Sequence, residues 1–205
     1  MQNTYDNQAQ WLGTIVQDPL YSHSLYGENF YTFALHVKRL SDTADVLPVT
    51  VSERILGKAK SGQIVRVFGQ VRSYNKVMAG SSRLILTVFA RRLEFISQAT
   101  ACHNEISLCG YLCKKPTYRK TPFDREITDI LLAVNRAYHK SDYLPCIAWG
   151  KTARFAARLE VGTHIRLKGR MQSRAYEKTY PTGETTIKTA YEISIAQLEV
   201  ITDEW

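Results

Sequence analysis

The two halves of the chain repeat one another. They match at an offset of 97 residues, which grows to 100 in the middle of each half and to 105 near its end. The matched residues include Gly13 with Gly110, Pro19 with Pro116, Arg39 with Arg136, Gly69 with Gly169 and Ser73 with Ser173. Each copy of about 95 residues is large enough to bury a small core, and two long copies do not suit a solenoid. We therefore expect two tandem domains of one fold, residues 1–98 and 103–205.

Each half is predicted to be mostly strand. Apolar residues in the second half alternate with polar ones, as in half-buried strands, except where the period becomes helical. The predicted strands are 105–113, 127–136, 143–149, 163–176 and 185–201, and the predicted helices are 151–160 and, in the first half, 52–60. Three strands, a helix and two strands is the order of an oligonucleotide-binding (OB) fold. The predicted class is all-β, with two tandem five-stranded OB-fold barrels that each carry one short helix between strands 3 and 4.

Composition restricts the class of protein. Apolar residues make up 44% and charged residues 22% of the chain, as in globular domains. No apolar run reaches the roughly 20 residues that span a bilayer, and the N-terminus lacks a basic and then apolar signal segment. The four cysteines and five histidines show no metal-site or disulfide spacing. We expect a cytoplasmic protein without membrane, metal or cofactor, and not an enzyme, because no nucleophile with a base and no catalytic carboxylate pair is present.

Several ordered motifs in the second half resemble bacterial single-stranded DNA-binding proteins. The segments 135–136, 145–153 and 169–176 and the opening 110–119 are similar to that family at the right spacing, and the likeness covers about residues 104–201. The resemblance implies sequence-tolerant binding of single strands. Because the family generally works with four OB-folds, it also implies a homodimer of this two-domain chain. The family's acidic C-terminal tail is not found here, since the chain stops soon after the last strand, so recruitment of partners by such a tail is in doubt.

Charge and aromatic residues indicate where a strand would bind. A single strand offers phosphates and splayed bases, so its binder needs cations interleaved with flat rings. Residues 114–178 hold fifteen Lys or Arg against six Asp or Glu. The rings at the family's stacking positions and the cations near them are the predicted nucleic-acid contacts: Tyr138, Tyr143, Trp149, Tyr176, Arg119, Arg136, Lys151 and Arg174.

The first half departs from this pattern. Its residues at the four stacking positions are Ser41, Val46, Ser52 and Lys76, none of which carries a ring. Its eleven basic and seven acidic residues still leave a net positive charge. We expect this half to be degenerate, acting either as a weak binder or in assembly.

Two functions of different classes remain open. One is a sequence-tolerant, nucleoid-associated single-strand binder that protects DNA in replication, recombination or repair, with RNA as an alternative ligand. The other is a primosome-like or conjugation accessory factor, whose OB surfaces mainly meet another protein. Residues alone do not distinguish a chromosomal from a phage or plasmid process, and they do not give the footprint in nucleotides.

Overall fold

The computed structural model describes residues 6–41, 43–78, 81–98, 103–179 and 183–202. The side chain of Tyr138, one of the predicted stacking residues, lies outside the described part. Elements of the first half are β1 (Asn7–Ile15), β2 (Leu20–Leu25), β3 (Glu28–Lys38), β4 (Ala44–Ser52), α1 (Glu53–Leu56), β5 (Ile64–Met78) and β6 (Ser81–Ile96). Those of the second half are β7 (His103–Leu112), β8 (Thr117–Lys120), β9 (Glu126–Arg136), the 3-10 turn η1 (Ala137–His139), β10 (Lys140–Trp149), α2 (Gly150–Ala156), β11 (His164–Thr179) and β12 (Thr185–Val200).

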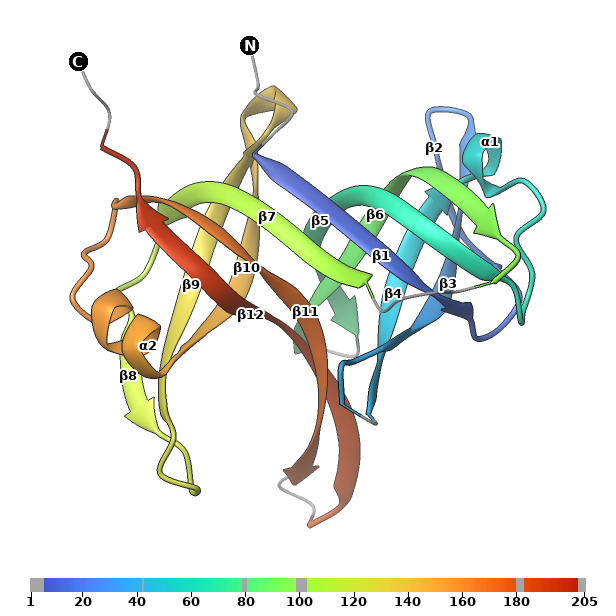
Figure 1. Cartoon of the computed structure of the whole chain (residues 1–205). Helices are drawn as coiled ribbons and strands as arrows, with labels where there is room; N and C mark the ends of the chain where they lie inside the picture. Colours follow the sequence, from blue (N-terminus) through green and yellow to red (C-terminus); the bar gives the residue numbers. More distant parts are fainter. Residues whose placement is uncertain (1–5, 42, 79–80, 99–102, 180–182, 203–205) are drawn as a thin grey trace.

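Strand pairing closes on itself in each half. In the first half β1 pairs with β3, β3 with β4, β4 with β6 in parallel, β6 with β5, and β5 again with β1. The second half repeats this circuit as β7, β9, β10, β12, β11 and back to β7. The repeated circuit and the single helix before the fourth long strand are those of the OB-fold predicted from the sequence (Figure 1).

Alternation along the strands separates the core from the surface. On β10 the side chains of Leu144, Cys146 and Ala148 are buried in the barrel, whereas Tyr143 on the opposite face is half exposed. The same period of two puts Trp149 on the outer face with Tyr143, because residues an even number apart share one side of a strand. This face is only partly open to solvent, because Ile147 between the two rings is buried and Trp149 is half-buried.

Paired glycines allow each barrel to bend. A β-bulge lies at Gly69 in β5 and at the equivalent Gly169 in β11. A Cβ on either glycine would collide with a carbonyl oxygen of the neighbouring strand, that of Phe89 or that of Ser194. Their retention in both halves is explained by this close approach of two backbones.

The halves are joined edge to edge. Residues 7–12 of β1 pair antiparallel with 103–108 of β7, so that the two barrels form one twelve-stranded sheet (Figure 1). Ala9 lies opposite Ile106, and these two residues are equivalent at the repeat offset of 97. A local two-fold axis therefore passes between them, and contacts of one half with the other are expected in reciprocal pairs.

The helices and two short strands correct the sequence prediction. The helix predicted for 52–60 is a single turn, α1, which ends where Gly57 takes a φ of 55°, and the helix predicted for 151–160 ends at Ala156. Each half also has a sixth strand, β2 or β8, that pairs with β3 or β9. Every residue of both added strands is exposed, so neither leaves a burial pattern in the sequence.

Candidate nucleic-acid interface

A stripe of polar and aromatic side chains follows β11. Every second residue of this part of β11 lies on one face of the strand: Arg170, Gln172, Arg174 and Tyr176. Tyr176 is 37% exposed. Their partners on β12 are, in order, Ser194, Glu192, Ala190 and Lys188. Successive side chains of this stripe are thus about 6 to 7 Å apart on a paired strand. The stripe holds two cations and one ring in fixed order.

Trp149 lies beside this stripe at the end of β10. Its ring is half-buried, and its Nε1 atom donates a hydrogen bond to Ser194 Oγ at 3.1 Å. Ser194 in turn is the cross-strand partner of Arg170. A groove of about 470 Å³ opens here, and we call it the Trp149 groove; its lining residues are Arg39, Arg125, Trp149, Arg170, Gln172, Ser173, Arg174 and Ser194.

The groove brings together two of the predicted contacts, Trp149 and Arg174, and adds two cations that the sequence prediction missed. Arg170 was detectable, because it lies four residues before Arg174 on the same strand face. Arg125 follows the tight turn at Asp124, whose φ is 57°, and only the folded chain brings it to the groove. Within the described ranges, no hydrogen bond or ion pair occupies the side chains of Arg125, Arg170 or Arg174, so these guanidinium groups are available to an anionic ligand.

Two other predicted cations are already paired. Arg119 binds Asp129 through two hydrogen bonds of 2.6 and 3.2 Å, and the hydrogen bond to Asp129 raises the pKa of the Arg119 guanidinium. Arg136 lies 3.4 Å from the Oδ1 atom of Asp142, a carboxylate with no exposed surface. Their charge is partly neutralised in the free protein, although they stay predicted contacts.

The remaining predicted contacts lie on the outer surface of the same half. Tyr143 is 49% exposed on β10, six residues before Trp149 and on the same strand face. Lys151 is exposed in the first turn of α2. Neither lines the Trp149 groove. The ligand path that would include all the predicted residues is therefore longer than this one groove.

Buried aspartates fix the position of one half against the other. Asp45 accepts a 2.7 Å hydrogen bond from the Ser173 amide, and the equivalent Asp142 accepts one of the same length from the Ser73 amide. Burial raises the pKa of the Asp45 carboxyl, but the hydrogen bonds from Arg39 and Ser173 outweigh it and hold that pKa below its ordinary value. Because Ser173 lines the Trp149 groove, this network also fixes one wall of the site.

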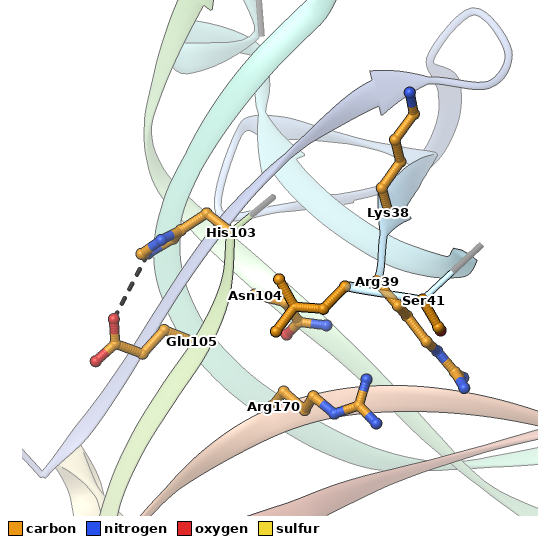
Figure 2. Close-up of a pocket in the computed structure, with 8 residues that line it drawn as sticks. Lys38, Arg39, Ser41, His103, Asn104, Glu105 and Arg170 are labelled. Atoms are coloured by element: carbon orange, nitrogen blue, oxygen red, sulfur yellow. Dashed lines mark ion pairs between the residues drawn. The ribbon is translucent and has the colours of Figure 1, made fainter. Parts of the chain in front are cut away.

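A second cavity lies next to the groove and is lined by residues of both halves. It has a volume of about 640 Å³, shares Arg39 and Arg170 with the Trp149 groove, and is also lined by Lys38. Figure 2 shows Arg170 and Asn104 of the second half near Arg39 and Ser41 of the first, whereas Lys38 points away from them; the His103–Glu105 ion pair of 3.6 Å lies on the other side. Cations of both halves therefore line two neighbouring cavities.

Two other classes of site, a metal centre and a membrane span, have no candidate among the described residues. No group of three or more His, Cys, Asp or Glu side chains in these ranges is placed to hold a metal ion. Among the same residues, no helix is long and apolar enough to cross a membrane.

Comparison with known proteins identifies the family. Residues 103–201 match the single-strand binding protein family. Single-stranded DNA-binding protein B of Bacillus subtilis is 35% identical over 81 residues, which are 36% of this chain and 72% of that protein. Single-stranded DNA-binding protein 2 of Streptococcus agalactiae is 31% identical over 83 residues, 37% of this chain and 63% of the relative. The crystal structure of the single-stranded DNA binding protein from Thermus aquaticus superposes with a TM-score of 0.78 over 97% of this chain and 94% of that one, at 20% identity, so the shared fold extends over both halves.

Proposed function

Because this chain belongs to the single-strand binding protein family, we propose that it binds single-stranded DNA without regard to base sequence and without catalysing a reaction. The observation that carries the proposal is the Trp149 groove, where a half-buried indole lies beside the unpaired guanidinium groups of Arg125, Arg170 and Arg174. Its occupant is an unpaired strand, which offers a phosphate and a free base face at every nucleotide.

The groove chemistry favours stacking over base reading. The hydrogen bond from Trp149 Nε1 to Ser194 Oγ holds the indole in place without using its faces. A base stacks on any flat ring, and each such stack contributes about 1 to 3 kcal/mol, a magnitude measured on proteins of this kind. Guanidinium groups contact phosphates, which carry no sequence information. Tolerance of base sequence follows, and duplex DNA is disfavoured because its bases are already stacked on one another.

The experiment is a titration of labelled dT, dA and mixed-base oligonucleotides at several salt concentrations. Affinities for the three should differ little, and log affinity should fall with log salt by about 0.7 per neutralised phosphate. A flat salt response, or a strong preference for one sequence, would contradict the proposal. RNA oligonucleotides in the same series decide whether the 2′-hydroxyl matters. Absence of binding to every strand would favour the protein-interaction alternative.

The assembly and place of action are parts of the same proposal. We expect a homodimer with four OB-folds that acts beside the chromosome in the cytoplasm and protects exposed strands in replication, recombination or repair. The dimer is checked by light scattering, in which twice the monomer mass of 23.4 kDa is expected. A mass of one chain at micromolar concentration would reject the dimer without touching the binding proposal.

A further inference from the structure

The first half contains a ring, Phe89, on the strand beside the one that carries the counterpart of Trp149. Phe89 of β6 lies opposite Thr50, and Ser194 of β12 lies opposite Ile147. Thr50 and Ile147 are equivalent at the offset of 97, so strand pairing makes Phe89 the counterpart of Ser194. The same equivalence follows from the offset of 105 in the last strands. Two independent registers therefore agree.

Ring and serine have exchanged strands between the halves. The second half has Trp149 on β10 with Ser194 on β12, whereas the first half has Ser52 on β4 with Phe89 on β6. In the second half the two members of this pair are hydrogen bonded to each other. The serine that stands in place of Trp149 thus does not mean that the first barrel lacks a ring at this point of its surface.

The surroundings of Phe89 suit a stacking platform. Its ring is half-buried and is supported by the buried Phe30, whose centroid is 5.6 Å away at an interplanar angle of 46°. Phe30 in turn stacks on His23 at 5.0 Å. The Arg91 guanidinium lies 5.4 Å from the Phe89 centroid, within cation–π range. A half-buried ring with a nearby cation is also found at Trp149, where arginines line the same groove.

A second ring is displaced along the strand. Tyr176 of β11 corresponds to Lys76 of β5, but Tyr74 lies two residues earlier on the same face and is 50% exposed. Lys76 is exposed, and in the described part of the chain no ion pair or hydrogen bond occupies its ammonium group. Its cross-strand partner is Arg83, which adds a second cation to this end of the ribbon. The ring is therefore displaced by two residues along the strand, which keeps it on the same face.

We propose that the first half carries a second single-strand binding surface, with Phe89 and Tyr74 as its stacking rings and Arg91 and Lys76 as its cations. The proposal rests on the function proposed above for the second half. The first half was expected to be a weak binder or an assembly domain because its four stacking positions lack rings; this proposal places its rings at displaced positions. The chain then holds two strand segments, one on each barrel.

The test counts binding sites on the full chain. A dT oligonucleotide of about 10 nucleotides, within the range that one OB-fold holds, is titrated by calorimetry. We expect two oligonucleotides per chain. Tyr74→Ala and Phe89→Ala should each weaken the first-half site by roughly 5- to 150-fold and bring the count at moderate concentration to one. Tyr176→Ala should leave the first-half site intact.

Matched controls separate binding from folding. Phe95→Ala removes an exposed phenylalanine from the same strand as Phe89, and Tyr26→Ala removes a fully exposed tyrosine from the same half as Tyr74; both should keep two sites. Circular dichroism confirms folding, and Tyr74→Ala, which truncates an exposed ring, remains a test even where Phe89→Ala unfolds the barrel. One site per chain in the parent, unchanged by Tyr74→Ala and weakened by Tyr176→Ala, would overturn this proposal while leaving the second-half function standing. No binding by the parent would overturn both.

Discussion

Asp45 and Ser173 lie 128 residues apart in the chain, yet the Ser173 amide donates a 2.7 Å hydrogen bond to Asp45 Oδ1. The local two-fold repeats the contact between Asp142 and the Ser73 amide at 2.7 Å. Duplication has thus produced a reciprocal interlock, in which each half supplies a carboxylate and a serine to the other. Its carboxylates have no exposed surface, so the orientation of the two barrels depends on them.

The first prediction concerns the stability of this interlock. Asp45→Ala should lower the free energy of unfolding by about 3 kcal/mol, because it leaves Arg39 and the Ser173 amide without their buried acceptor. The matched control is Asp129→Ala, which breaks the exposed pair with Arg119 and should cost less than about 1 kcal/mol. Urea unfolding followed by circular dichroism measures both, and equal losses would contradict the prediction.

The second prediction is a pH dependence that comes from the same carboxylate. The pKa of Asp45 is below its ordinary value in the folded chain, so its stabilisation is present above the unfolded pKa of about 3.9 and is lost as pH falls through the folded pKa. The parent should therefore lose stability below about pH 4 more steeply than Asp45→Ala does. Urea midpoints taken at intervals between neutral and acid pH provide the comparison. Parallel curves for the two proteins would show that the Asp45 carboxylate does not cause the loss of stability at acid pH.

The third prediction assigns affinity to the stacking rings. Tyr176→Ala and Trp149→Ala should each weaken single-strand binding at the second-half site by roughly 5- to 150-fold, the effect of losing one stacked base. Fluorescence anisotropy with a labelled oligonucleotide gives the two affinities. Tyr176 is 37% exposed, and circular dichroism checks that its variant stays folded. If Trp149→Ala unfolds the second barrel, Trp149 is a packing residue; if it stays folded and binds like the parent, the groove is not the site.

The fourth prediction separates free from paired cations. Arg174→Gln should reduce the steepness of the log–log salt dependence by somewhat under one unit, because one phosphate contact is lost. Arg119→Gln should change it less, since the hydrogen bonds of 2.6 and 3.2 Å to Asp129 already neutralise that side chain. Affinities of the two variants between 50 and 200 mM salt are compared at one oligonucleotide length. A larger change for Arg119 would show that the ion pair opens on binding.

The order of strands could be predicted because burial imposes a period of two on each long strand. Leu144, Cys146 and Ala148 of β10 are one such run, and the duplicated glycines Gly69 and Gly169 mark equivalent bends. The strands β2 and β8 could not be predicted, because a ribbon with every residue exposed has no apolar alternation. Helix lengths were overestimated. Apolar residues three or four positions apart continue past Leu56 and Ala156, where α1 and α2 end, so the pattern did not mark these ends.

The candidate site was predictable in its residue types and less so in its contacts. Trp149 and Arg174 do line one groove. Counting charges could not show that Arg119 pairs with Asp129 and Arg136 with Asp142. These ion pairs depend on the register of neighbouring strands, which the sequence does not give. The offsets likewise identified Ser52 as the counterpart of Trp149 but not the ring of Phe89, which lies on a strand that is distant in sequence.

The most direct test of the binding account compares one oligonucleotide with its own duplex, using the parent and the double variant Arg174→Gln/Tyr176→Ala. The account predicts that the parent prefers the single strand at least tenfold, a difference of about 1.4 kcal/mol, and that the double variant keeps only the part of this preference that the first-half site supplies. Equal or tighter binding of the duplex by the parent, or a preference unchanged in the double variant, would contradict it.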